Sequence, residues 1–442
     1  MLFTNKDLKD MIVPLFLEQL LVLLVGIADT LVISYAGEAA VSGVSLVNMV
    51  NTIFIYLFTA LASGGAVVIS QYIGAQAQKR AGEAASQLLM FSLVLSLVLS
   101  GLVLWANRFL LGLMFGSVEP AVMDAAVIYL RISAYSYPAL AVYNAGAALY
   151  RSLGKTGITM KISLLSNVIN LAGNLIGVFV LHAGVAGVAY PSLIARAFSA
   201  VAITALRFRK SNGVFYQKSW IFRWDGTLLN QMLRIAIPNG IEKGLFQLVK
   251  VALSSIVALF GTYQIAANGV AQSIWSMAAL SGIAVGPVFI TVIGQCMGGN
   301  DVDGAAFYFK KLMKITLLLS FIWNVLILAA TPLLLRFYAL EEQTKVLVLQ
   351  LVLIHNLFNG VVYPFSALSN GLRAAGDVKF TTAVSIFTTV GVRLVLSILF
   401  AKVMNLGVIG IALAMCCDWT MQAVCYVWRL RSGKWKKFKV II

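Results

Sequence analysis

Charged residues are scarce in this sequence. Asp, Glu, Lys and Arg make up only 11% of its 442 residues, whereas a soluble globular protein carries about 25%. Hydrophobic residues make up 60%, and the mean hydropathy is +0.92. This composition excludes a soluble globular domain and indicates a protein that crosses the membrane many times.

Cysteine and histidine are also rare, and neither occurs at a spacing typical of a metal site or a catalytic site. The two histidines, His182 and His355, lie outside any H-E-x-x-H pattern. The four cysteines lie in apolar segments without metal-ligand spacing, which favours packing roles over a disulfide framework. They are Cys296, Cys416, Cys417 and Cys425. The glycine-rich stretches "ASGGAVV" and "QCMGGND" lack the strand and the Lys of a phosphate loop. We therefore expect no metal site, no cofactor and no ATP site.

Long apolar segments dominate what is present. A bilayer core of about 30 Å is crossed by a helix of roughly 20 apolar residues, and twelve such segments follow one another. They lie near residues 11–34, 45–73, 86–106, 120–150, 158–181, 184–206, 230–258, 266–296, 306–334, 343–371, 378–403 and 407–430. The first is too long for a signal-peptide core and lacks a cleavage site, so we expect a retained helix. The prediction is an all-α polytopic membrane protein.

The positive charges, which give a net charge of +17, are placed asymmetrically. If the N-terminus is cytoplasmic, 24 of the 33 Lys and Arg residues fall in cytoplasmic connections and tails. The outer connections hold four, namely Arg108, Arg336, Lys345 and Lys402. This distribution follows the positive-inside rule and predicts cytoplasmic termini in a plasma membrane, the cytoplasmic membrane of a prokaryote. No nucleic-acid module is visible, so we exclude that partner.

The chain repeats itself. A shift of 224 residues pairs identical residues: Pro14 with Pro238, Glu18 with Glu242, and Gln71 with Gln295. Further along, a shift of 222 pairs Arg151 with Arg373, and a shift of 223 aligns "GVAGVA" at 184 with "GVIGIA" at 407. These are two copies of one six-helix unit. Because each copy crosses the membrane an even number of times, both have the same orientation.

The repeat sets the expected domains. We predict an N-terminal six-helix lobe (1–206), a basic cytoplasmic connector (207–228), a C-terminal six-helix lobe (229–430) and a basic tail (431–442). The connector carries Trp220 and Trp224, which suit an amphipathic strap at the membrane interface. The tail either rests on anionic lipid headgroups or is solvated without a specific partner.

Several motifs in both halves resemble one known family. "ADTLVISYAGEAAVSGVS" leaves the first helix, "SQYIGA" and "GQCMGG" close the second and eighth, and "YRSLGKT" and "LRAAGDV" follow the fourth and tenth. Together with the paired halves, these resemble the multidrug and toxic compound extrusion (MATE) family over nearly the whole chain. The resemblance implies a V-shaped pair of six-helix bundles that exports amphipathic, often cationic compounds in exchange for H⁺ or Na⁺.

Asp29 is a full charge inside the apolar run "LLVLLVGIADTLVIS", where a carboxylate costs roughly 2.5 to 3.5 kcal/mol on insertion scales. On the fifth predicted helix, Asn167, Asn170 and Asn174 form a stripe whose oxygens suit Na⁺ or hydrogen bonds to a protonatable Asp. The resemblance implies that Asp29 is the cation-coupling residue. Some relatives have Asp where this chain has Asn174, which favours H⁺ over Na⁺. The alternative is a structural ion pair, or an Asp facing water.

Glu18 lies eleven residues before Asp29, on the same face of the first helix. Glu18 and its repeat mate Glu242 are candidates to face one another across a central cavity, where repulsion would favour protonation of one. Neutralisation by Lys243 and Lys250 is the alternative.

Further candidates for the substrate cavity are Gln247 and aromatic side chains that hold flat cations. The aromatic candidates are Tyr35, Tyr56, Tyr135, Tyr137, Trp275, Phe358 and Tyr363. A lipid-facing position is the alternative for each of them.

Arg393 and Asp418, at similar depth on the last two helices, are candidates for a structural ion pair. A functional role for these two charges is the alternative.

An ion-coupled antiporter for amphipathic organic cations is therefore the leading hypothesis, with membrane lipids as surroundings and no obligate protein partner. A flippase for a lipid-linked saccharide or another lipid-like substrate is the alternative, although its cavity would be strongly cationic, and here the candidate charges are mixed. An intramembrane enzyme would need a catalytic cluster that the sequence does not show. A receptor or scaffold fits poorly with a duplication that places charges inside both halves.

Overall fold

The protein is helical throughout the part of the chain that the structure, a computed structural model, describes: residues 2–116, 118–206 and 213–441. Within these ranges every regular element is a helix. Twelve of the helices are long and apolar enough to cross a membrane. The predicted all-α polytopic fold with twelve membrane helices is confirmed.

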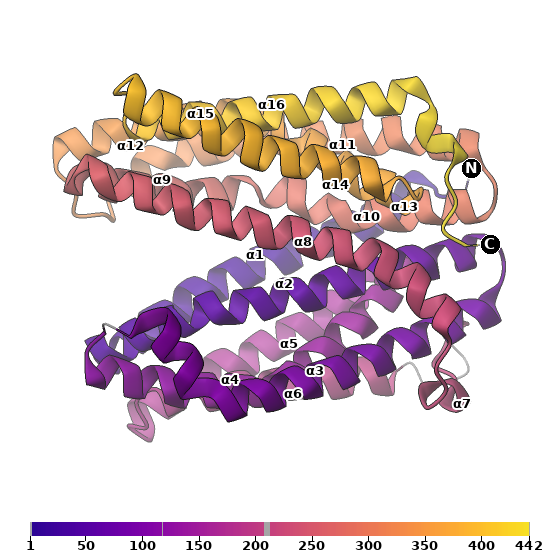
Figure 1. The fold of residues 1–442 in the computed structure, drawn as a ribbon, viewed down its shortest axis with the longest axis horizontal. Helices are drawn as coiled ribbons and strands as arrows, with labels where there is room; N and C mark the ends of the chain where they lie inside the picture. Colours follow the sequence, from indigo (N-terminus) through magenta and orange to yellow (C-terminus); the bar gives the residue numbers. More distant parts are fainter. Residues whose placement is uncertain (1, 117, 207–212, 442) are drawn as a thin grey trace. The chain divides into compact units, whose positions relative to one another are not determined.

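The first half has one continuous helical segment for each crossing (Figure 1). The segments are α1 (Asn5–Ser34), α2 (Glu38–Gly74), α3 (Gln78–Phe115), α4 (Pro120–Ser152), α5 (Thr156–Leu175) with η1 (Ile176–Val180), and α6 (Ala186–Ala205). The short α7 (Lys218–Ile221) follows the part of the connector, residues 207–212, that lies outside the described residues.

The second half has more broken crossings. Its first crossing is α8 (Gly226–Val257) with η3 (Ala258–Phe260), and its third is α11 (Val302–Leu335). The second crossing divides at Ala279 into α9 (Thr262–Ala278) and α10 (Leu280–Gly298). The fourth crossing comprises α12 (Glu342–Val361), η4 (Tyr363–Ala367) and α13 (Leu368–Ala374). Its break at Val362 lies just before Pro364, which has no backbone N–H to donate to the helical hydrogen bonds.

The last two crossings differ, since the fifth is segmented and the sixth is a single helix. The fifth runs through α14 (Val378–Ile386), η5 (Phe387–Leu394), α15 (Val395–Ile398) and η6 (Leu399–Val403). The sixth is α16 (Val408–Ser432), which is followed by η7 (Lys434–Lys437).

Two compact units account for the chain: Asn5–Ile237, and Pro238–Ile442 together with Met1–Thr4. Within the first unit α2 packs on α4 and α5 packs on α6; within the second, α9 packs on α12 and η5 packs on α16. The same crossings therefore pair in each half, as two copies of one unit require. The finer predicted boundaries, at 206/207 and 228/229, stay a prediction.

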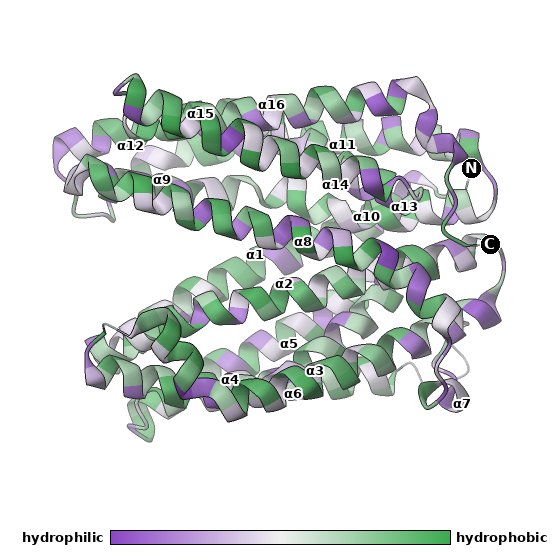
Figure 2. Ribbon diagram, viewed as in Figure 1, coloured by the Kyte–Doolittle hydropathy of each residue, from purple (hydrophilic) through white to green (hydrophobic). Residues whose placement is uncertain are grey.

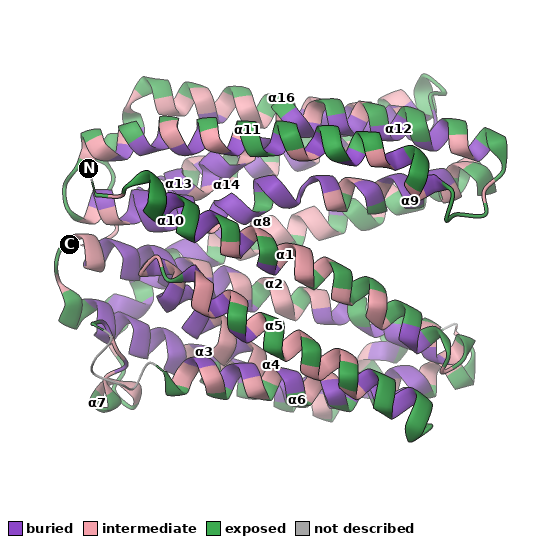
Figure 3. Cartoon of the chain, turned by 180° about the vertical axis from the view of Figure 1, so that it is seen from behind, coloured by how far each residue is buried: buried purple, intermediate pink, exposed green. Residues whose placement is uncertain are grey.

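The third crossing, α3, has one face of exposed apolar residues and an opposite face of buried small polar residues. Large apolar side chains such as Leu97, Leu102 and Trp105 are exposed on α3, whereas Ser96 and Ser100 are buried on its opposite face. The Ser100 hydroxyl donates a hydrogen bond of 2.6 Å to the carbonyl oxygen of Ala134 on α4. Small polar residues therefore join helices, and large apolar residues occupy exposed positions, where lipid would surround them. Figure 2 colours the residues by hydropathy and Figure 3 by burial.

Gly177 and Gly187 mark a close approach of two backbones in the first unit. A Cβ added at Gly177 would lie 2.1 Å from the carbonyl oxygen of Gly187, and a Cβ at Gly187 would lie 2.6 Å from that of Gly177. Only glycine permits η1 and α6 to meet at this distance.

We expect Gly177→Ala to lower stability by about 2 kcal/mol, because the methyl group must push two backbones apart. The measurement is the apparent melting temperature of the purified protein in detergent. Gly112→Ala is the matched control, since Gly112 lies inside α3 with no atom within 4 Å of its added Cβ. An equal melting temperature for the two variants would contradict the proposed contact.

Candidate cation site

Asp29 lies near the end of α1, beside the parallel helix α5. The side-chain amide of Asn170 donates a hydrogen bond of 3.0 Å to Asp29 Oδ2. The amide of Asn174, one turn further along, donates one of 2.7 Å to Asp29 Oδ1. Each carboxylate oxygen therefore accepts one N–H bond from a neutral group.

The same register holds the two helices together over a long distance. Eleven residues separate Glu18 from Asp29 on α1, and eleven separate Thr159 from Asn170 on α5. The Thr159 hydroxyl donates to Glu18 Oε2 at 3.2 Å, while the Asn170 amide binds Asp29. At 1.5 Å per residue, both polar contacts lie on one seam about 16 Å apart.

Ser192 on α6 is a member of this site that the sequence analysis missed. Its hydroxyl donates a hydrogen bond of 3.0 Å to Asn170 Oδ1. This bond fixes the orientation of the Asn170 amide, so that the NH₂ group points at Asp29. A hydroxyl directly after Pro191 in an apolar segment was the available signal, but nothing in the sequence linked it to the fifth helix.

Asn174 has an unused acceptor beside the carboxylate. Its side chain is fully buried, and its Oδ1 atom accepts no hydrogen bond from any residue that the structure describes. A buried acceptor without a donor is costly. A proton donor or a small cation that reached this oxygen would remove that cost.

In the described part of the chain, no hydrogen bond joins Asn167 to Asp29. The Asn167 side-chain amide donates to Ser163 Oγ at 3.5 Å, one turn earlier on its own helix. Asn167 was grouped with Asn170 and Asn174 because all three share a face of α5, and it lies about 10 Å before Asn174 along the axis. Its part in the site stays a prediction.

Asp29 is half-buried, and within the described ranges it forms no ion pair with Lys or Arg. The alternative of a structural salt bridge at this position is therefore not what the structure contains. A carboxylate held only by neutral donors changes the local charge when it binds a proton or a cation.

Glu18 and Glu242, in contrast, each have an arginine. Arg151 on α4 binds Glu18 Oε1 at 2.9 Å. Arg373 on α13 binds Glu242 Oε2, and its second nitrogen donates to Asn239 Oδ1 at 3.2 Å. The repeat aligns Glu18 with Glu242 and Arg151 with Arg373, so the two halves contain the same ion pair at equivalent positions.

The expectation of two unpaired, mutually repelling carboxylates is therefore wrong. Uncompensated charge in an apolar surrounding is expensive, and the arginine of the fourth crossing removes that cost. Both arginines were visible as repeat mates, but more than 130 residues separate each from its Glu, so no local pattern indicated the pairing.

The other candidates for a cavity fall into different surroundings. Tyr35 is exposed and lies against Phe179, with ring centroids 5.2 Å apart. Trp275 instead stacks on Trp419 at 5.8 Å and meets Tyr363 edge-on at 5.9 Å. Trp275 is thus a packing residue of the second unit. The Oε1 atom of Gln247 is buried and has no hydrogen-bond partner among the described residues.

Arg393 and Asp418 form an ion pair with 2.7 Å between Nε and Oδ2, and both side chains are buried. Gln422 donates a hydrogen bond of 2.9 Å to Asp418 Oδ1, and the Arg393 guanidinium lies 5.1 Å from the ring centroid of Phe246. The pair therefore joins η5 to α16 and contacts α8.

We expect Arg393→Leu to cost about 3–5 kcal/mol of stability, because it leaves Asp418 as a buried, unpaired charge. The double variant Arg393→Leu/Asp418→Leu should recover most of this loss. The readout is the thermal stability of the purified protein in detergent. Arg108→Leu, which removes an exposed pair of 3.8 Å with Asp124, is the control and should change stability by less than about 1 kcal/mol. A double variant as unstable as the single one would contradict the assignment.

The described residues contain no group of three or more His, Cys, Asp or Glu side chains that could hold a metal ion. The four cysteines form no disulfide within these residues, and two of them, Cys296 and Cys416, are buried. His355 is buried against Trp419, with ring centroids 6.4 Å apart.

Twelve membrane helices in two repeated halves define a polytopic membrane protein with the architecture of many transporters. The family model described as MatE matches residues 14–176 and 238–399, which is one match in each half. The chain belongs to this family of multidrug efflux transporters.

Individual relatives agree with this assignment. The chain is 27% identical to the uncharacterized transporter YisQ of Bacillus subtilis, over 96% of this chain and 93% of the relative. It is 22% identical to the probable multidrug resistance protein NorM of Thermotoga maritima, over 99% and 94%. A solved outward-facing MATE transporter of the MOP superfamily has the same fold, with a TM-score of 0.91 at 20% identity, covering 98% of this chain and 97% of that one.

Proposed function

We propose that this chain is an ion-coupled antiporter that exports amphipathic organic cations by alternating access, with Asp29 as the residue that carries the coupling ion. One observation supports the proposal above all: Asp29 is a membrane-embedded carboxylate bound by two neutral amides, Asn170 and Asn174. A group in this setting changes its charge without breaking an ion pair. It is suited to exchange a cation with water.

The orientation of the amides favours H⁺ over Na⁺. Asn170 and Asn174 both direct N–H groups at the carboxylate, so they stabilise an anion rather than offer oxygens to a metal ion. A Na⁺ site would need these amides turned round, and Ser192 holds one of them in place. A proton requires less rearrangement, because it binds one carboxylate oxygen of Asp29 directly and needs no further oxygen ligands.

Protonation would act as the switch. The ionised carboxylate keeps both amide bonds, whereas the neutral form loses part of their strength and no longer carries a charge into the apolar interior. A proton that binds one arrangement of the protein better than the other shifts the population between them. One charge moving through about 100 mV supplies about 2.3 kcal/mol, which corresponds to roughly a 50-fold substrate gradient.

The proposed orientation places both termini in the cytoplasm of a prokaryotic cell. The positive-inside distribution supports it. In the second unit, Phe3 bonds to Tyr308 at the start of α11, and Lys439 bonds to Asn300 just before that helix. The two ends of the chain thus lie beside one connection, as an even number of crossings requires.

Removal of the titrating group tests the proposal. In proteoliposomes, a pH gradient should drive transport of ethidium by the unaltered protein, and Asp29→Asn should reduce that transport at least 10-fold. Asn keeps the shape and hydrogen-bonding capacity of the side chain but cannot exchange a proton. Ethidium binding without a gradient should change less than threefold, since the proposal assigns Asp29 to coupling.

Glu342→Gln is the matched control, because it removes a carboxylate that is 85% exposed beside Lys345 on α12. It should transport at the unaltered rate. Normal gradient-driven transport by Asp29→Asn would overturn the coupling role, and so would equal losses in both variants.

A second prediction concerns the choice of ion. Asn174→Asp places a second carboxylate beside Asp29 and creates a stronger oxygen site, so transport should become at least fivefold more responsive to a Na⁺ gradient. Asn167→Asp adds the same charge to the same face of α5, away from Asp29, and should not respond. Equal Na⁺ responses in the two variants would contradict the assigned geometry.

A further inference from the structure

The described end of the connector is a rigid strap, not a free linker. This strap, residues 213–225, is bound to the start of α3. The backbone N–H of Gln217 donates to Ser86 Oγ at 2.9 Å, and its side-chain amide donates to the carbonyl oxygen of Lys79 at 2.9 Å. Gln87 on α3 donates to the carbonyl oxygen of Trp220 at 2.7 Å and accepts from the N–H of Asp225 at 3.0 Å.

Packing reinforces these bonds. Val214 and Tyr216 of the strap are buried. A Cβ added at Gly82 would lie 2.7 Å from the carbonyl oxygen of Phe215, so the strap lies directly on the backbone of α3. The strap therefore presents its remaining side chains in fixed positions.

Those side chains include large exposed aromatic groups. Phe222 is 90% exposed and Trp224 is 55% exposed. The Trp224 ring meets Phe91 of α3 edge-on at 6.3 Å, within the predicted membrane part of that helix. Arg223 lies over the Trp220 ring, 5.0 Å from its centroid. Exposed Trp and Phe beside basic residues, level with the first turns of a membrane helix, are typical of the headgroup region.

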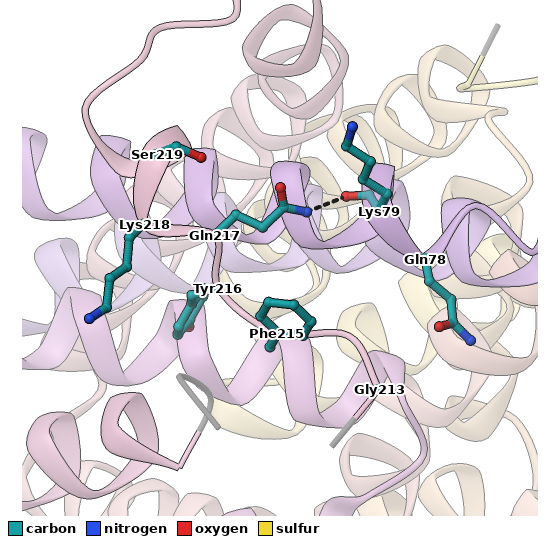
Figure 4. A pocket seen from close by; sticks show the side chains of 8 residues that line it. All are labelled: Gln78, Lys79, Gly213, Phe215, Tyr216, Gln217, Lys218 and Ser219. Carbon is teal, nitrogen blue, oxygen red and sulfur yellow. Dashed lines mark hydrogen bonds between the residues drawn. The ribbon is translucent and has the colours of Figure 1, made fainter. Parts of the chain in front are cut away.

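A pocket of about 640 Å³ opens between the strap and α3 (Figure 4). Two lysines line it, Lys79 from α3 and Lys218 from the strap, and in Figure 4 Gln217 lies between them. Ser219 adds a hydroxyl, and no acidic residue is among the lining residues.

Two carboxylates beside the strap share one arginine, since Arg80 binds Glu83 at 3.0 Å and Asp225 at 3.6 Å. Neither carboxylate lines the pocket, whose lining holds Lys79 and Lys218 and no acidic side chain. The lining is therefore cationic, and with the Ser219 hydroxyl it has the chemistry of a site for a phosphate group.

We propose that this pocket binds the phosphate headgroup of an anionic phospholipid from the adjoining leaflet. Lys79 and Lys218 neutralise the phosphate and Ser219 donates to it, while Phe222 and Trp224 keep the strap at headgroup depth. Free inorganic phosphate shares the charge but lacks the acyl chains that these aromatic residues would contact, so the lipid is the occupant. A bound lipid would attach the end of the first unit to the membrane surface.

The test uses the full-length protein in detergent and counts bound phosphatidylglycerol by native mass spectrometry, with phosphatidylcholine as the neutral probe. Lys79→Ala/Lys218→Ala should lower the apparent affinity for phosphatidylglycerol at least fivefold and leave phosphatidylcholine unchanged. Lys79→Arg/Lys218→Arg keeps the charge and should retain binding, which separates loss of the site from loss of the fold.

Lys310→Ala/Lys314→Ala is the matched control, because it removes two exposed lysines from α11 without touching the strap. It should bind phosphatidylglycerol as the unaltered protein does. Ten millimolar inorganic phosphate should displace less than a fifth of the lipid. Unchanged lipid binding by Lys79→Ala/Lys218→Ala, equal loss in the control, or displacement by phosphate would each overturn the proposal.

Discussion

The cost of an unpaired charge in an apolar surrounding governs the interior of both units. Buried carboxylates in this protein are matched by arginines: Glu18 by Arg151, Glu242 by Arg373, Asp377 by Arg429 and Asp418 by Arg393. Asp29 is the contrast, because Asn170 and Asn174 solvate it without neutralising it. A paired carboxylate resists any change of protonation, whereas a carboxylate held by amides accepts one with little rearrangement.

The duplication makes this contrast sharper. Both halves keep the Glu and Arg of the first and fourth crossings, which join the same two helices in each unit. At the position of Asp29 the second half has Leu253, which packs against an apolar cluster. Near the position of Asn170 it has Arg393, which binds Asp418. The second copy thus has an apolar residue and a neutral ion pair where the first has a carboxylate held by two amides.

Periodicity and composition predicted the helices well, because a membrane span is a local property of about 20 consecutive residues. All twelve spans were visible in the apolar runs. The break of the eighth crossing at Ala279 and the wide turns of η5 were not, since neither contains a Pro and the single Gly391 within η5 does not by itself indicate a wider helix. Asn170 and Asn174, which the sequence placed on one face of α5, both bind Asp29, whereas Asn167 on the same face binds Ser163, because a shared face does not specify depth.

The sequence by itself determined the membrane class, the number of crossings, the duplication and the one carboxylate set deep in an apolar run. Each follows from residues that are near in the chain or that recur at a constant shift. Only the tertiary structure decided which polar groups meet: Ser192 on Asn170, Arg151 on Glu18, and the strap on α3. Such contacts join residues from different helices, and they depend on helix rotation and depth, which packing sets and no local pattern encodes.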